Sequence, residues 1–162
     1  MEFTESRMKQ NSTVKEKSLN PQTSVRSQQP AVTDDKLDER IITAVRSAAE
    51  KKAIDIVVLD LREIATFTDY FVITSGTNER QVQAISDEVY ETLKKAGSPA
   101  ARVEGYKTAE WILLDYGDFI VHVFAEKSRR FYDLERLWRE STRVSLPPDE
   151  TGEGPGSLRR ES

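Results

Sequence analysis

The feature that most constrains this fold is a nearly uninterrupted apolar run, Ile54–Leu61, with the sequence IDIVVLDL. β-Branched residues dominate the run, which predicts a β-strand. Because polar residues do not alternate regularly with apolar ones, neither face of this strand is suited to water. The chain is therefore expected to form a sheet that other elements cover on both faces.

Two amphipathic patterns predict helices in the first half of this domain. The first helix is expected to begin at Asp34-Asp35, after an N-cap at Thr33. Its apolar stripe consists of Leu37, Ile41, Val45 and Ala48. A second strand, Asp69–Ser75, leads through Gly76 to a helix that Thr77 is expected to cap and Gly97 to end. The stripe of that helix consists of Val82, Ile85, Val89 and Leu93.

The second half of the pattern adds a short strand at Arg102–Gly105, a hairpin and a last helix. The hairpin strands are Trp111–Asp115 and Asp118–Phe124, joined by Tyr116-Gly117. The last helix is expected from about Ser128. Its packing face consists of Phe131, Leu134, Leu137 and Trp138. The order α-β-β-α-β-β-β-α predicts a single-domain α/β fold, with a mixed β-sheet and flanking helices.

Composition confines this fold to the middle of the chain. Residues 1–33 are polar and aperiodic, and residues 147–162 hold three of the six prolines, so both are predicted to be disordered tails. Residues 34–146 remain as one domain, and they keep the net charge of −4 because the tails are neutral together. No apolar run is long enough for a membrane span and no targeting signal is convincing, so we expect a cytoplasmic protein.

The same composition excludes several kinds of site. Cysteine is absent, which excludes a thiol nucleophile and thiolate metal ligands. His122 is the only histidine, which argues against zinc. The net charge of −4 argues against a protein that binds nucleic acid by neutralising phosphates. We expect no metal, no cofactor and no direct nucleic-acid readout.

The predicted hairpin has two unlike faces. A two-residue turn at Tyr116-Gly117 pairs Asp115 with Asp118 and Trp111 with His122. One face is then wholly apolar and consists of Ile112, Leu114, Phe119, Val121 and Val123. The other face is mixed and consists of Trp111, Leu113, Asp115, Asp118, Ile120, His122 and Phe124. Two interpretations stay open: the mixed face is the centre of a partner interface, or a helix covers it with His122 hydrogen-bonded inside.

No catalytic constellation is evident. The Ser75-Gly76-Thr77 junction lacks the glycines and lysine of a phosphate-binding loop, which favours a capped strand-to-helix turn. Asp60, Asp115 and Asp118 are the candidate metal carboxylates, but the last two flank a turn, where aspartate is common for local reasons.

A basic and aromatic cluster, Arg129-Arg130-Phe131-Tyr132, opens the last helix. On one interpretation the arginines are solvated and Phe131 belongs to the core. On the other, Arg129, Arg130 and Tyr132 extend the mixed hairpin face to hold a partner.

Three blocks of the sequence resemble the ribosomal silencing factor family, also called the Iojap-related family. The blocks are TDYFVITSGTNERQVQAI, EGYKTAEWILLDYGDFIVHVF and RRFYDLERLW. The resemblance covers Asp34–Trp138 and leaves both tails outside. It implies a fold related to nucleotidyltransferases but without their catalytic carboxylates.

The resemblance also implies a function. Members of this family are non-enzymatic repressors that bind the fourteenth protein of the large ribosomal subunit (uL-fourteen) and block both joining of the small subunit and an intersubunit bridge. Trp111 matches a family tryptophan associated with this binding. The expected partner-binding residues are Trp111, Asp115, His122, Phe124, Arg129, Arg130 and Tyr132. Two alternatives remain, a nucleotide-binding enzyme that uses Ser75-Gly76-Thr77 and a homodimer formed through the mixed face.

Overall fold

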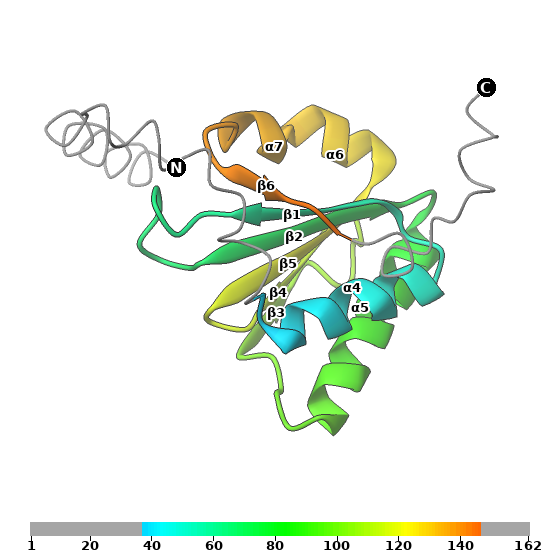
Figure 1. Ribbon diagram of the computed structural model, residues 1–162. Coiled ribbons are helices and arrows are strands. Elements are labelled where there is room, and N and C mark those ends of the chain that lie inside the picture. The colour runs from blue at the N-terminus through cyan, green and yellow to red at the C-terminus, as the bar shows by residue number, and fades with distance from the viewer. Residues whose placement is uncertain (1–36, 147–162) are drawn as a thin grey trace, which may run out of the picture.

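The computed structural model describes residues 37–146, which form one six-stranded mixed sheet with four helices (Figure 1). The strand order is β3-β4-β5-β2-β1-β6, and neighbours are antiparallel except for the central pair, β2 and β5. The strands are β1 (Ile54–Asp60), β2 (Tyr70–Gly76), β3 (Arg102–Glu104), β4 (Trp111–Asp115), β5 (Phe119–Ala125) and β6 (Thr142–Val144). The helices are α4 (Glu39–Glu50), α5 (Glu79–Lys95), α6 (Glu126–Tyr132) and α7 (Leu134–Leu137). The tails predicted at 1–33 and 147–162 lie outside the described residues.

Helices cover both faces of this sheet, α4 and α5 on one side and α6 and α7 on the other (Figure 1). Along β1, Val58 belongs to the core under α4 and α5, whereas Val57 and Leu59 belong to the core under α7. The predicted α/β class is confirmed, and so is the prediction that the first strand is covered on both faces.

Helix α4 begins later than the sequence pattern predicts. Asp38 is its N-cap, and its carboxylate accepts a hydrogen bond from the backbone N–H of Arg40 at 2.8 Å. The guanidinium of Arg40 pairs with the same carboxylate, which reinforces the cap. The predicted start at Asp34 is therefore wrong for this helix, and residues 33–36 lie outside the described part. Leu37 precedes the helix but still packs against the core.

The N-cap of α5 is Asn78 rather than Thr77. The side-chain oxygen of Asn78 accepts from the backbone N–H of Gln81 at 2.8 Å. The Gln81 side-chain oxygen in turn accepts from the N–H of Thr77 at 2.7 Å, so cap and first turn support each other. At the other end Gly97 has φ 93°, which confirms the predicted C-terminal glycine.

The hairpin keeps its predicted faces but not its predicted register. Its two-residue loop is Gly117-Asp118, and Trp111 pairs with Phe124 rather than with His122. Gly117 at the first loop position has φ 86°, a conformation that Tyr116, the predicted first loop residue, adopts poorly. The resulting slip is two residues, so the apolar face survives intact. Asp118 leaves the mixed face for the loop, where it pairs with Arg40 at 2.8 Å.

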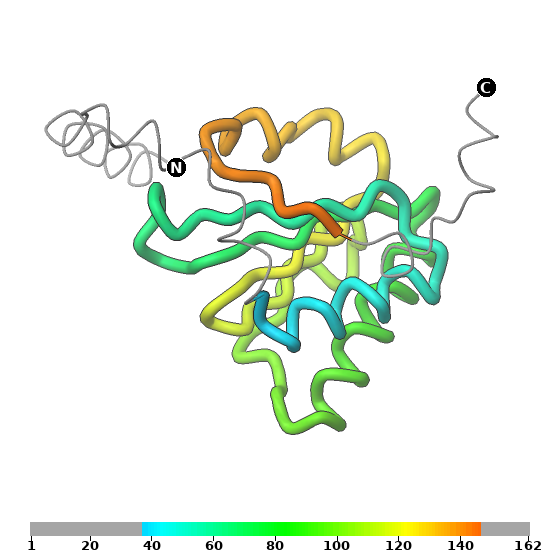
Figure 2. Tube along the Cα trace, in the orientation of Figure 1, coloured from blue at the N-terminus to red at the C-terminus, as the bar shows by residue number. Residues whose placement is uncertain are grey.

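The predicted last helix is two short helices. α6 begins at Glu126 and ends at Tyr132, because Asp133 adopts a left-handed conformation with φ 48° that separates it from α7. Leu134 and Trp138 are buried as predicted, but Phe131 is 78% exposed, so its assignment to the packing face is wrong. The chain then returns beside β1 as β6, an edge strand that the sequence pattern missed (Figure 2). Among the described residues no helix is long and apolar enough to cross a lipid bilayer.

Candidate functional site

The mixed face of the hairpin lies partly under α6 and α7, and Trp111 marks the boundary between its covered and open parts. Ile120, His122 and Phe124 are buried, whereas Trp111 is only half-buried. The indole ring of Trp111 packs on Phe124 with ring centroids 4.9 Å apart, and on Tyr132 of α6 at 4.8 Å. The interpretation that a helix covers this face is therefore confirmed for Ile120, His122 and Phe124, whereas Trp111 stays partly open.

His122 fixes the orientation of the Trp111 indole. The Nε1–H of Trp111 donates a hydrogen bond to Nδ1 of His122 at 3.1 Å, which requires that Nδ1 carry no proton. Nε2 of His122 is buried and has no hydrogen-bond partner among the described residues, and the ring lies edge-on to Phe71 at 4.4 Å. Burial lowers the pKa of His122 to about 3, so the imidazole is neutral at pH 7. His122 therefore holds Trp111 through a hydrogen bond from the buried side and is not itself exposed.

Asp115 lies at the far end of β4 from Trp111. Its carboxylate accepts from the backbone N–H of Gly117 at 2.8 Å and pairs with Arg102 of β3 at 3.3 Å. Both contacts stabilise the hairpin turn, the local role for which aspartate is common at such positions. The structure therefore does not bring Asp115 and Trp111 together in one contact area.

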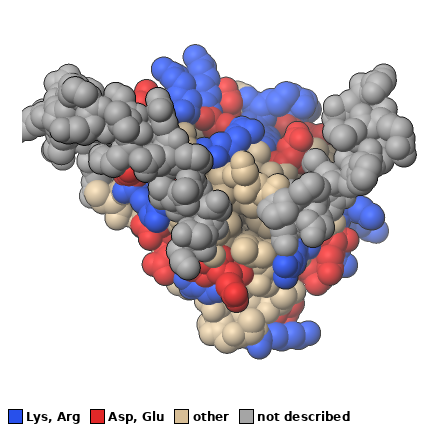
Figure 3. Space-filling view, in the orientation of Figure 1, with Lys and Arg blue, Asp and Glu red and all other residues tan. Residues whose placement is uncertain are grey.

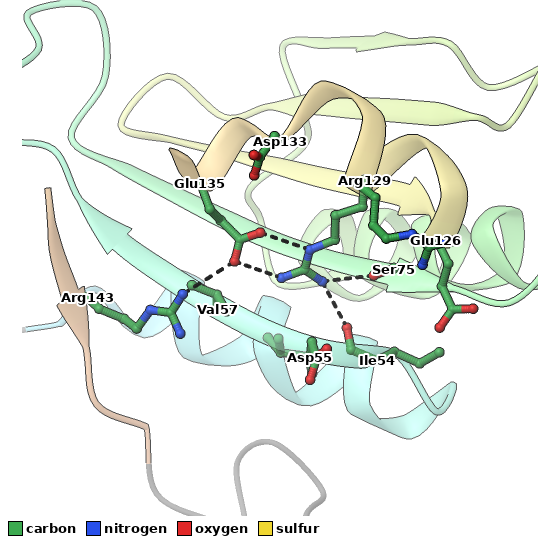
Figure 4. Close-up of a pocket in the computed structure, with 11 residues that line it drawn as sticks. Ile54, Asp55, Val57, Ser75, Glu126, Arg129, Asp133, Glu135 and Arg143 are labelled. Atoms are coloured by element: carbon green, nitrogen blue, oxygen red, sulfur yellow. Dashed lines mark hydrogen bonds and ion pairs between the residues drawn. The ribbon is translucent and has the colours of Figure 1, made fainter. Parts of the chain in front are cut away.

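Arg129 is an internal clamp rather than a surface group. Its guanidinium, 12% exposed, donates to Ser75 Oγ at 2.8 Å and to the carbonyl oxygen of Ile54 at 3.2 Å (Figure 4). Its two other nitrogens meet both carboxylate oxygens of Glu135 at 3.1 Å. Arg143 of β6 approaches the same carboxylate at 3.4 Å. One side chain thus joins α6 to β1, β2 and α7.

The pocket around this clamp has a volume of about 610 Å³ and carries both signs of charge. Asp55, Glu126, Asp133 and Glu135 line it together with Arg129, Arg130 and Arg143. This mixture favours neither an anion nor a cation. The described residues also contain no group of three side chains that could hold a metal ion.

Two polar groups of the Ser75-Gly76-Thr77 junction already have hydrogen-bond partners and are not free to bind a phosphate. The hydroxyl of Ser75 accepts from Arg129, and the N–H of Thr77 donates to Gln81. A Cβ on Gly76 would lie 3.1 Å from the backbone nitrogen of Val82. Glycine at this position therefore allows close packing of strand and helix, and the sequence interpretation as a capped turn agrees with these contacts.

The open part of the site lies on α6 and α7. Phe131 is 78% exposed and Tyr132 49%, and their rings meet edge to face at 4.9 Å. A second pocket of about 600 Å³ adjoins them, and it is lined by Arg130, Phe131, Tyr132, Asp133, Arg136, Leu137, Arg139 and Glu140. Lys and Arg side chains gather on this side of the molecule, at the top of Figure 3.

Sequence reasoning found part of this surface and missed the rest. Arg130 and Tyr132 are exposed on it as the partner interpretation requires. Phe131 and Leu137, which the sequence pattern assigns to the packing face of the last helix, are exposed, and so are Arg136 and Arg139. The spacing of apolar residues does not predict the break at Asp133. The sequence does show an excess of basic residues from Lys127 to Arg143, six against three acidic ones.

Known proteins resemble this chain over much of the described fold. A sequence model of the family described as "Ribosomal silencing factor during starvation" matches residues 34–161. A Halalkalibacterium halodurans protein named "Ribosomal silencing factor RsfS" is 40% identical over 108 residues, 67% of this chain and 92% of that protein. A mouse protein named "Mitochondrial assembly of ribosomal large subunit protein 1" is 34% identical over 92 residues, 55% of this chain and 40% of that protein.

A solved structure shares the fold. The crystal structure of a Chromobacterium violaceum protein is similar with a TM-score of 0.63 and 31% sequence identity, over 69% of this chain and 90% of that chain. The family match at residues 34–161 spans every described strand and helix, and it therefore includes the hairpin, α6 and α7.

Proposed function

Since this chain belongs to the ribosomal silencing factor family, we propose that it is a non-enzymatic translational repressor that binds the large ribosomal subunit and prevents the small subunit from joining. The name of the mouse relative, which refers to assembly of the ribosomal large subunit, supports the choice of subunit. The chain acts in the cytoplasm, where it meets free subunits.

The contact on the large subunit is its fourteenth protein, uL-fourteen, as the family resemblance implies. The single observation that best supports a protein contact is the Trp111–Tyr132 pair, a half-buried indole packed against a half-exposed phenol. Tryptophan and tyrosine are the side chains most often found at the energetic centre of interfaces. The hydrogen bond from Trp111 to His122 holds the indole in place before binding, which lowers the entropic cost of association.

Repression is steric. A body of this size on the subunit-facing side of the large subunit occupies the surface on which an intersubunit bridge forms, and no turnover is needed. The net charge of −4 favours encounter with a basic ribosomal protein. Tyr132 packs against Trp111 on the open side, whereas the buried side chains of His122, Phe124 and Arg129 hold this surface in position.

The first test is co-sedimentation of the purified protein with isolated large subunits, followed by subunit joining in sucrose gradients. We expect wild-type protein to bind and to suppress joining, and Trp111→Ala to weaken binding about tenfold or more, the loss typical of an interface anchor. Tyr106→Ala is the matched control, because Tyr106 is also a partly exposed aromatic residue but lies between β3 and β4 and hydrogen-bonds to Asp87 of α5.

Three outcomes separate the alternatives. Loss of binding in Trp111→Ala alone supports both the target and the surface. Equal binding by both variants, with unchanged circular dichroism, keeps the target and removes Trp111 as anchor. No binding by the wild-type protein would refute the proposal. The alternatives would then be self-association, measured by light scattering over a concentration series, and nucleotide binding, measured by calorimetry.

A further inference from the structure

Three arginines on or just after α6 and α7 have no partner within the described fold. Carboxylates of the described fold pair with Arg40, Arg62, Arg102, Arg129 and Arg143. Within residues 37–146, by contrast, the side chains of Arg130, Arg136 and Arg139 are exposed and form no ion pair or hydrogen bond. All three line the same pocket of about 600 Å³.

This pocket lies in a basic region of an acidic protein. From Lys127 to Arg143 the chain has six basic and three acidic residues, although the whole chain has a net charge of −4. Glu135 is already bound by Arg129 and Arg143. The positive side chains of this stretch without a partner in the described fold are Lys127 and the three arginines. The negative ones are Asp133 and Glu140, so positive charge is in excess. The surface therefore attracts anions.

An exposed aromatic residue lies among these charges. Phe131 is the most exposed large apolar side chain of the described fold, and it leans edge-on against Tyr132. Arginine forks match phosphate oxygens, and exposed rings provide faces on which bases or sugars stack. RNA offers a partner for both kinds of group, with phosphates for the arginines and bases or sugars for Phe131.

We propose that Arg130, Arg136, Arg139 and Phe131 form a contact site for the phosphate backbone of ribosomal RNA, next to the protein-docking surface around Trp111. This inference rests on the proposed function, because it takes the large subunit as the partner. It divides the binding surface by chemistry: Trp111 and Tyr132 dock on protein, and the unpaired arginines hold the RNA beside it. The contact reads no base sequence, because arginines bound to phosphates fix position only.

The test compares two binding partners, the isolated large subunit and purified uL-fourteen, at several salt concentrations. The variant is the triple substitution Arg130→Gln, Arg136→Gln and Arg139→Gln, which touches only exposed side chains. Arg80→Gln on α5 is the control, because Arg80 is also exposed and has no partner among the described residues, but lies on the helix layer of the opposite face. Thermal unfolding checks that each variant remains folded.

We expect the triple variant to bind large subunits about tenfold or more weakly near 0.15 M salt, while its affinity for uL-fourteen stays unchanged. The slope of log affinity against log salt concentration should fall by roughly one for each phosphate that the variant no longer neutralises. Phe131→Ser should weaken subunit binding with little change in that slope. Arg80→Gln should match the wild type in every measurement.

Three results would overturn this proposal. Equal weakening towards the subunit and towards uL-fourteen would assign the arginines to an acidic protein patch. Unchanged subunit affinity and slope in the triple variant would leave the arginines without a binding role. If the wild-type protein bound uL-fourteen but not the large subunit, or bound neither partner, the proposed function itself would fail.

Discussion

The two faces of the sheet are built in different ways. On one face, α4 and α5 are long helices with side-chain caps, and they seal an apolar core that contains Ile41, Val45, Ile85 and Val89. On the other, α6 and α7 are short, α6 has no buried residue, and a polar clamp at Arg129 secures them. The first face is held by hydrophobic burial, whereas the second combines a smaller apolar core, which includes Leu134 and Trp138, with directed polar contacts at Arg129.

Under the proposed function, this difference separates stability from binding. Under α4 and α5 the apolar side chains face inward and contribute to packing. The short helices α6 and α7 leave aromatic and basic side chains outside, and the polar contacts of Arg129 hold the helices that carry them. We expect substitutions under α5 to change stability alone, and substitutions around α6 to change stability and binding together.

The largest expected effect on stability is that of Ile85→Ala. Ile85 is fully buried between α5 and the sheet, and removal of three carbon atoms from such a site typically costs about 3–4 kcal/mol in the free energy of unfolding. Urea unfolding measures this loss. Large-subunit affinity at a temperature where the variant is still folded should equal that of the wild type; a change in affinity would mean that the two faces are coupled.

Arg129→Ala should have the next largest effect, about 2–3 kcal/mol, because it leaves Glu135 and Ser75 without their buried partner. Unlike Ile85→Ala, it should also weaken large-subunit binding, since α6 carries Tyr132. Arg143→Ala is the matched control: it removes an exposed partner of the same Glu135 carboxylate and should cost less than about 0.5 kcal/mol. Equal losses for the two variants would refute the clamp.

The smallest effect is a pH dependence that His122 introduces. In the unfolded chain its pKa is near the ordinary 6.5, and in the folded protein burial lowers it to about 3. Between these values the unfolded state binds a proton that the native state does not, so stability falls as pH falls from about 6.5 towards 3. At pH 5 the loss relative to pH 7 is about 2 kcal/mol.

His122→Gln isolates this contribution, because glutamine does not titrate and its side-chain oxygen can still accept from Trp111. We expect the wild type to lose about 2 kcal/mol more than the variant between pH 7 and pH 5 in urea unfolding. Carboxylates with shifted pKa values, such as Asp38, are common to both proteins and cancel in the difference. Since His122 is the only histidine, parallel curves would show that it is not buried in its neutral form.

Local patterns in the sequence predicted the sealed face well. The stripes of α4 and α5 are buried nearly as the spacing of their apolar residues indicates, because a helix of this length presents a regular face. The exact caps were wrong, at Thr33 and Thr77, because several neighbouring polar residues can accept the same backbone hydrogen bonds. Asp38 and Asn78 have this role because Arg40 and Gln81 reinforce them.

The candidate site was predicted only in part. Trp111, Tyr132 and Arg130 were identified from their residue types, and they lie at or next to the open surface. The role of Arg129 was not accessible, because its partners Ser75 and Ile54 are 54 and 75 residues away along the chain. Phe131 is exposed because the left-handed conformation of Asp133 ends α6. The sequence pattern assumes one unbroken helix and therefore does not predict this break.

The sequence by itself determined which side chains share a face of each strand. Side chains alternate with a period of two, so even the two-residue error in the hairpin register left Ile112, Leu114 and Val121 on the core face. Only the tertiary structure decided which polar groups are satisfied inside and which remain outside. That outcome depends on contacts between distant segments: Arg129 finds its partners on β1, β2 and α7, whereas Arg130, its neighbour in sequence, finds none within the described fold.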